Sequence, residues 1–253
     1  MNDFYKDVIP ERAMPDWETY QATPIIECQD ALVPVSVSKR IAVYPAYYKM
    51  NVANSIPECH VRSQVFERLL QAANLLPDDI QLVVLDGWRP FSVQQYLFDT
   101  LVNLIRHANE GMTAEKVELE ARNLVSPPST DPSAPSPHLT GGSVDVTLAD
   151  MDGRFLDMGT LFDEANPLSW SCALEQKSCN AEELQARDNR RLLFNVMRQA
   201  GFTNLPSEWW HYDFGNQLWA YNSGADNAIY GATSLPGIEK LWQKQLKNHP
   251  QPI

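Results

Sequence analysis

The chain has few cysteines and no long apolar run, and each shortage excludes a class of protein. Four cysteines among 253 residues make neither a disulfide framework nor a paired C-x-x-C zinc pattern. No apolar run approaches the roughly 18 residues of a membrane-spanning helix. The polar N-terminus also lacks the apolar region of a secretory signal. We therefore expect a cytoplasmic protein with reduced thiols, although a bridge between Cys172 and Cys179 is an open alternative.

Positive charge is scarce as well, with 20 Lys and Arg against 32 Asp and Glu and a net charge of −12. Such a surface repels phosphate backbones and anionic lipids, which argues against nucleic-acid and membrane partners. The length allows one large or two small domains. We expect a single domain over residues 1–253, with residues 1–40 as an irregular extension packed on it, because closely spaced prolines there prevent long elements.

Apolar periodicity and capping residues predict four helices. They cover residues 61–76, 92–105, 113–125 and 180–200. Ser92 is expected to cap the second helix. Asn180 and Glu183 form a capping-box-like start for the last one, which Gly201 ends.

Strands are predicted by β-rich runs and by alternation. The apolar run Ile80–Leu85 predicts a buried strand, and the alternating residues of Ser143–Leu148 predict a half-buried one. A turn at Asp152-Gly153 predicts a partner strand over 154–157, and Trp209–Phe214 is also strand-like. Because strands and helices do not alternate regularly, we expect an α+β fold.

Two of the five histidines stand beside residues that suit a metal site. The other three are interpreted as structural or terminal: His60, His107 and His249. His138 precedes Gly141-Gly142 and Asp145, and two glycines permit a bend that brings the imidazole back over the strand carrying Asp145. That bend would let one imidazole and one carboxylate converge on a metal.

His211 lies three residues after Glu208, in a Glu-Trp-Trp-His sequence. Both side chains can reach one point if Glu208 lies in a turn and His211 already in a strand. A zinc hydrolase needs about three protein ligands and an open position for water, plus a carboxylate that moves the proton from the attacking water to the leaving amine. Taken alone, each motif more often belongs to a packed strand whose histidine is hydrogen-bonded within the fold. Together they favour a hydrolytic metal site.

Arg89 follows a predicted strand in the sequence Asp86-Gly-Trp-Arg89-Pro. An arginine at a strand end can reach into a cleft and stabilise an oxyanion. The alternative role for Arg89 is a salt bridge to Asp86. The two roles are compatible if Asp86 orients Arg89.

These motifs resemble the zinc-dependent D-alanyl-D-alanine dipeptidases, relatives of vancomycin-resistance dipeptidases and of D,D-carboxypeptidases. The similar motifs are D-G-x-R-P at residues 86–90, S-x-H-x-x-G-x-x-x-D at 136–145 and E-x-W-H at 208–211. The resemblance spans about residues 40–230. It implies one Zn²⁺ per chain, Glu208 as general base and acid, and Arg89 as the group that stabilises the tetrahedral intermediate. The implied metal ligands are His138, Asp145 and His211. The implied fold is a small antiparallel sheet flanked by helices.

The same resemblance implies residues that bind the substrate. Asp163 is similar to the aspartate that recognises the free amino group of the dipeptide, although it could instead cap the turn that follows it. Ser136 is similar to a hydroxyl that helps to bind the substrate. The family's substrate-contacting tyrosine is one of Tyr44, Tyr47 and Tyr48.

The expected function is hydrolysis of the small dipeptide D-Ala-D-Ala to two D-alanines by a zinc metallopeptidase. One alternative is a cell-wall D,D-carboxypeptidase or endopeptidase of the same superfamily, which the missing secretory signal disfavours. Another is a catalytically inactive module that binds peptidoglycan fragments. The presence of both Glu208 and Arg89 disfavours that alternative.

Overall fold

A five-stranded sheet forms the centre of the computed structural model, which describes residues 4–122, 125–129, 131–175 and 180–248. Its strands, in spatial order, are β2 (Ile41–Val43), β4 (Ile80–Asp86), β5 (Ser143–Asp150), β7 (His211–Asp213) and β6 (Thr203–Asn204). β2 runs parallel to β4, and the other neighbouring strands are antiparallel. A separate antiparallel pair joins β1 (Leu32–Pro34) to β3 (His60–Arg62).

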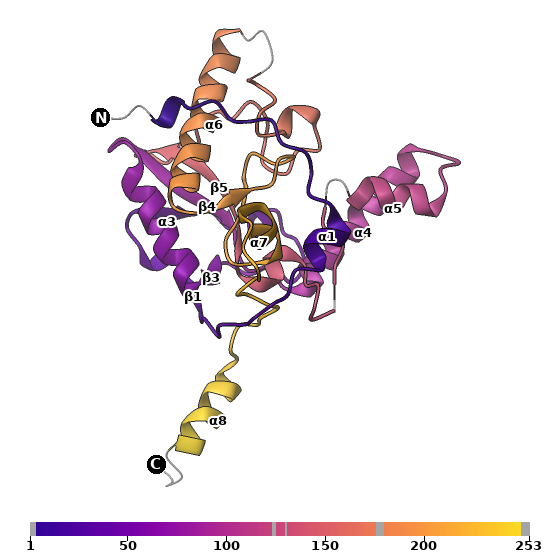
Figure 1. The fold of residues 1–253 in the computed structure, drawn as a ribbon, viewed down its shortest axis with the longest axis vertical. Helices are drawn as coiled ribbons and strands as arrows, with labels where there is room; N and C mark the ends of the chain where they lie inside the picture. Colours follow the sequence, from indigo (N-terminus) through magenta and orange to yellow (C-terminus); the bar gives the residue numbers. More distant parts are fainter. Residues whose placement is uncertain (1–3, 123–124, 130, 176–179, 249–253) are drawn as a thin grey trace.

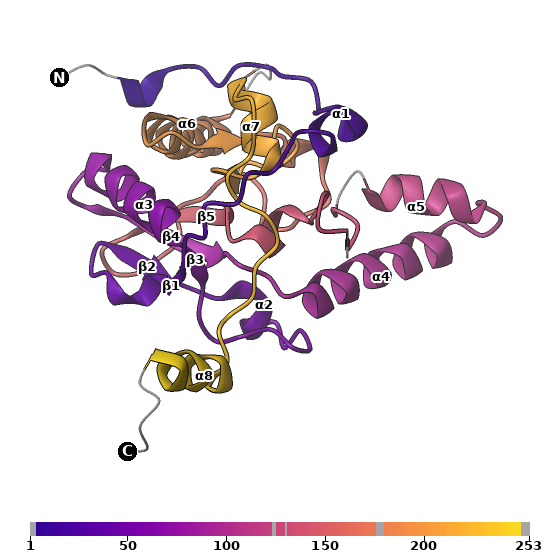
Figure 2. The same cartoon turned by 60° about the horizontal axis from the view of Figure 1, so that its bottom comes forward.

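One face of the large sheet carries the main hydrophobic core. Helices α3 (Ser63–Leu75) and α6 (Ala181–Gln199) pack there against the apolar side chains of β4 and β5 (Figure 2). The α6 helix begins with the predicted capping box, in which Asn180 accepts from the Glu183 amide and Glu183 accepts from the Asn180 amide. Gly201 follows its end with a φ of +90°, a conformation that favours glycine.

The opposite face of the sheet holds a smaller cluster that includes α2 (Ala46–Lys49) and the inward side chains Val83, Leu85 and Ala149. Asp145 alternates with the core residues of β5, so its side chain lies on this second face. The predicted half-burial of β5 is wrong, because the strand is buried from Ser143 to Ala149. As the central strand of the sheet it is covered on both faces, and its polar residues lie in an enclosed site.

Two helices form an arm that projects to one side of the sheet (Figures 1 and 2). They are α4 (Phe91–Ala108) and α5 (Ala114–Arg122), which pack on each other through an apolar cluster. The N-terminal segment crosses the body, with η1 (Phe4–Lys6) beside α6 and α1 (Trp17–Gln21) beside α7 (Gln217–Ser223). α8 (Ile238–Asn248) lies apart from the body at the C-terminal end (Figure 1). Short 3-10 turns complete the chain: η2 (Val35–Val37), η3 (Pro137–Thr140) and η4 (Pro167–Ser169).

The α+β class is confirmed, and three further details differ from the sequence-based expectations. The helix expected to start after Ser92 begins at Phe91 with Pro90 at its cap, because Pro90 has the extended backbone of an N-cap residue and the start of a helix leaves amides without partners in any case. The expected strand over 154–157 is a turn with a single bridge from Ala149 to Phe155. In the aromatic segment only His211–Asp213 is strand, since Trp209 and Trp210 lie in a turn. Cys179 and His249 lie outside the described residues. Among the described residues, no helix combines the length and apolar character needed to cross a bilayer.

Candidate functional site

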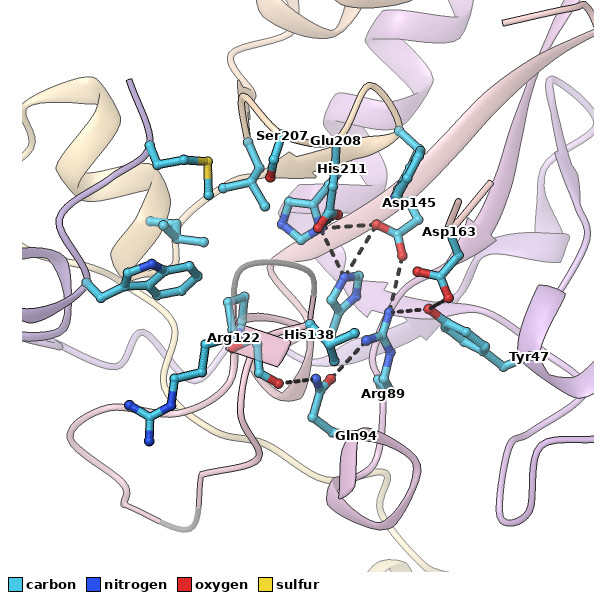
Figure 3. Close-up of a pocket in the computed structure, with 18 residues that line it drawn as sticks. Tyr47, Arg89, Gln94, Arg122, His138, Asp145, Asp163, Ser207, Glu208 and His211 are labelled. Carbon is cyan, nitrogen blue, oxygen red and sulfur yellow. Dashed lines mark hydrogen bonds and ion pairs between the residues drawn. The ribbon is translucent and has the colours of Figure 1, made fainter. Parts of the chain in front are cut away.

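Three buried side chains converge on the second face of the sheet (Figure 3). His138, Asp145 and His211 each offer one metal-binding atom, and these atoms all lie within 4.8 Å of one another. Asp145 and His211 face each other directly in the antiparallel pairing of β5 with β7. His138 lies in η3, which Gly141 ends with a φ of +73° before the chain enters β5. This left-handed turn is the bend that the glycine pair predicted.

The second glycine is required by a close approach of the backbone. A Cβ atom on Gly142 would lie 2.6 Å from the carbonyl oxygen of Phe214. Phe214 follows β7, so this contact keeps the η3 turn tight against the strand that carries His211.

Each imidazole is oriented by an acceptor outside the cluster. Nδ1 of His138 lies 2.8 Å from the carbonyl oxygen of Gly87, and Nε2 of His211 lies 3.2 Å from Oδ1 of Asp213. Such an acceptor fixes the N–H on the outer nitrogen and leaves the other nitrogen free for a ligand bond. Nε2 of His138 and Nδ1 of His211 accordingly face the cluster, 3.2 Å from each other.

The sequence-based reasoning missed Asp213. This carboxylate is fully buried and accepts hydrogen bonds from Ser143 Oγ at 2.7 Å and Asn216 Nδ2 at 2.6 Å. The even offset from His211 was an available signal, because residues i and i+2 of a strand share one face.

The charges of the cluster suit a cation. Burial acts to raise the pKa of Asp145, but His138 and His211 hold it well below its usual range, so the group is an anion. Burial likewise acts to lower the pKa of His211, while Asp213 and Asp145 raise it well above its usual value. Two imidazoles and one carboxylate are the donor set of hydrolytic zinc sites with an open position. The residues therefore fit a zinc ion.

Glu208 lies beside the cluster without joining it. A carboxylate oxygen lies 3.9 Å from Nδ1 of His211, and the side chain is 19% exposed. Burial raises the pKa of Glu208 to about 8, with Asp145 acting in the same direction and His211 against it. The position of Glu208 in the turn before β7 is the arrangement that the three-residue spacing required.

Arg89 is held in a fixed orientation at the edge of the cluster. Its Nε donates to Asp86 at 2.7 Å, its Nη1 donates to Gln94 Oε1 at 2.9 Å, and its Nη2 lies 3.2 Å from Asp145. The guanidinium also stacks over the ring of Tyr47, 4.7 Å from the ring centre. Arg89 thus forms the salt bridge to Asp86 and also lines the pocket.

The predicted substrate-binding residues differ in whether they face the pocket. Asp163 lines the same pocket as the cluster and accepts from the Tyr47 hydroxyl at 3.2 Å (Figure 3). Of the three candidate tyrosines only Tyr47 is buried there; Tyr44 and Tyr48 are exposed. The hydroxyl of Ser136 instead donates to Pro127 within the loop 126–137, at 3.0 Å. The turn after Asp163 is held by Glu164, which accepts from the Leu161 amide.

Donor sets of this kind, with a carboxylate and an arginine beside them, are those of metal-dependent hydrolases. The family model of Peptidase_M15, described as D-ala-D-ala dipeptidase, matches residues 33–229, and the chain belongs to this family. It is 31% identical over 221 residues to a D-alanyl-D-alanine dipeptidase of Synechocystis sp., covering 80% of this chain and 89% of that one.

Two further comparisons cover less of the chain or are more distant. A D-alanyl-D-alanine dipeptidase of Escherichia coli is 36% identical over 134 residues, which is 53% of this chain and 55% of that one. A solved structure of a vancomycin resistance D,D-pentapeptidase with Zn(II) aligns with a TM-score of 0.40 at 17% identity, over 68% of this chain and 82% of that chain.

Proposed function

We propose that this chain hydrolyses the dipeptide D-Ala-D-Ala to two D-alanines with one zinc ion per chain. The observation that carries the proposal is the convergence of His138, Asp145 and His211, whose ligand atoms lie within 4.8 Å of one another. Family membership and the curated relatives, which are D-alanyl-D-alanine dipeptidases, support the substrate.

The two histidines and Asp145 are the proposed zinc ligands. Acceptors at Gly87 and Asp213 hold the outer N–H of each ring, so the inner nitrogens point at one place. A zinc ion held there would supply a Lewis acid for the peptide carbonyl and would lower the pKa of a bound water to about 7.

Glu208 is the proposed proton carrier. Its carboxylate takes a proton from the attacking water as the oxygen bonds to the carbonyl carbon. It then gives that proton to the nitrogen as the C–N bond breaks. The raised pKa, about 8, suits a group that must both accept and release a proton near neutrality.

Arg89 is proposed to stabilise the negative charge that develops on the carbonyl oxygen. Because Asp86 and Gln94 already hold the guanidinium, little reorganisation is needed at the moment of reaction. Asp163, supported by the Tyr47 hydroxyl, is proposed to bind the ammonium group of the substrate. Ser136 is proposed to contribute through its place next to Pro137, which with Ser126 lines the pocket.

We also propose that residues 1–253 make one domain with a cytoplasmic location. Contacts between the N-terminal extension and the body support the single domain: Arg12 donates to the carbonyl oxygen of Asn204 at 2.9 Å, and the Ile9 amide donates to Glu175. The acidic, cysteine-poor composition supports the location.

The test is metal analysis combined with a comparison of three substrates. We expect one zinc per chain, cleavage of D-Ala-D-Ala, and little cleavage of L-Ala-L-Ala or of a longer peptide that ends in D-Ala-D-Ala. Cleavage of the longer peptide in preference to the dipeptide would support the D,D-carboxypeptidase alternative. A protein that binds D-Ala-D-Ala without cleaving it would support the inactive binding module.

A further inference from the structure

A second and larger cavity adjoins the catalytic pocket. It has a volume of about 500 Å³, against about 50 Å³ for the pocket that holds the metal cluster. The two share part of their lining, including Asp163, Glu208 and Trp210. Small-molecule sites range from about 300 to 1,000 Å³, so the methyl side chains of D-Ala-D-Ala leave most of this space unfilled.

The wall on the α4 side is apolar. Leu97, Leu101 and Leu104 line the cavity and recur at i, i+4 and i+7, which places them on one face of the helix. Packing within the arm accounts for only part of this stripe: Leu101 also packs against the cluster with α5, whereas Leu97 and Leu104 do not, and Leu104 is 62% exposed. The N-terminal segment and the loop after Asp163 complete the cavity with Trp17, Pro167 and Trp170.

Three polar residues of the cavity, Asp163, Ser207 and Glu208, also line the catalytic pocket, while other polar residues of its lining belong to the loop after Asp163 or to α4. Glu164 also lines the cavity, but its carboxylate accepts from the Leu161 amide at 2.8 Å and from Asn166 Nδ2 at 2.9 Å, so it holds its own loop. Asp163 and Glu208 are the carboxylates that face both spaces. The cavity therefore suits an apolar group attached to the part of the substrate that contacts Asp163 and Glu208.

We propose that this cavity binds the side chain of the amino-side residue, and that the preferred substrates are D-dipeptides whose first residue is large and apolar. The inference rests on the proposed function, in which Asp163 binds the ammonium. The side chain of the first residue is attached to the same carbon as that ammonium. Arg89 and the three proposed zinc ligands line the smaller pocket and do not line this cavity. The leaving residue lies beyond the scissile bond and is further from the cavity.

The test compares kcat/KM for D-Ala-D-Ala, D-Leu-D-Ala, D-Phe-D-Ala and D-Ala-D-Phe with the zinc-loaded enzyme. We expect kcat/KM for D-Phe-D-Ala to exceed that for D-Ala-D-Ala about tenfold or more, because an aromatic side chain leaves water for an apolar cavity. D-Leu-D-Ala should fall between them. D-Ala-D-Phe contains the same two residues in the reverse order, and its kcat/KM should exceed that for D-Ala-D-Ala by a smaller factor.

Poorer cleavage of D-Phe-D-Ala than of D-Ala-D-Ala would overturn the inference and leave the proposed function standing. A gain confined to D-Ala-D-Phe would assign the cavity to the leaving residue and would also overturn it. Failure to cleave D-Ala-D-Ala and all the other dipeptides would instead contradict the proposed function.

Two variants test the cavity wall directly. Ala165→Trp fills the space from the exposed loop, and Leu104→Gln makes the α4 wall polar. Each should lower the ratio of kcat/KM for D-Phe-D-Ala to that for D-Ala-D-Ala by about tenfold. The matched control is Leu119→Gln on α5, an equally exposed leucine that does not line the cavity; it should leave the ratio unchanged. An unchanged ratio in both cavity variants would contradict the inference.

Discussion

Nε2 of His211 lies 3.2 Å from both carboxylate oxygens of Asp213, two residues further along the same strand. The pairing directs the other ring nitrogen at Asp145 and His138. Ser143 and Asn216 donate to Asp213 and hold its carboxylate in place. The orientation of one proposed zinc ligand thus depends on a buried carboxylate that is not itself a ligand.

The first prediction concerns this carboxylate. Asp213→Asn should weaken zinc binding about 10- to 100-fold, because the acceptor that orients His211 becomes a neutral amide. Competition with a fluorescent chelator measures the affinity independently of turnover. Asp152→Asn, at an exposed carboxylate in a surface turn, is the control and should bind zinc as the parent does. Equal affinity in the Asp213 variant would show that the contact does not orient the ligand.

The second prediction separates Glu208 from the metal ligands. Glu208→Ala should keep its zinc and lose about 10²- to 10⁴-fold in kcat, since only proton transfer is removed. Zinc content and single-turnover rates check the two parts of this expectation. Loss of zinc in the variant would make Glu208 a ligand, and undiminished turnover would place the base elsewhere.

The third prediction concerns Arg89. Arg89→Ala should lower kcat about 10²- to 10³-fold, more than it raises KM, because the guanidinium acts on charge that develops in the transition state. Because Arg89 also pairs with Asp86 and Asp145, thermal unfolding of the variant must be measured alongside. Arg89→Lys retains the charge but not the fixed fork of donors, and should recover only part of the loss. An effect on KM alone would reassign Arg89 to binding of the substrate carboxylate.

The fourth prediction tests recognition of the free amino group. N-acetyl-D-Ala-D-Ala should be rejected by several powers of ten, because acetylation removes the cation and leaves the Asp163 carboxylate without a positively charged partner. Asp163→Ala should cleave the free dipeptide poorly and lose most of the discrimination. Comparable cleavage of the free and acetylated dipeptides by the parent enzyme would contradict the assignment.

Much of the fold and the cluster could be predicted from the sequence because its signals are local. The capping box at Asn180, the glycine bend at Gly141 and the turn-to-strand position of Glu208 each depend on a few neighbouring residues. The register that sets Asp145 opposite His211 is not local, since it joins strands about 60 residues apart in the sequence.

Other features depend on tertiary packing that no short motif encodes. Tyr47 and Tyr48 are adjacent in sequence, yet only the first is buried against Arg89. The alternation of β5 predicted solvent on one face, whereas that face is enclosed by the site. The large cavity draws its walls from the N-terminal segment, α4 and the loop after Asp163, which are far apart in the sequence.

The most direct test of the central claim is an anomalous difference map recorded at the zinc absorption edge from crystals of the zinc-loaded protein. The account predicts one strong peak per chain, about 2.0–2.2 Å from Nε2 of His138, an oxygen of Asp145 and Nδ1 of His211. Glu208 should lie outside the coordination sphere. A peak elsewhere in the chain, or none between these three side chains, would contradict it.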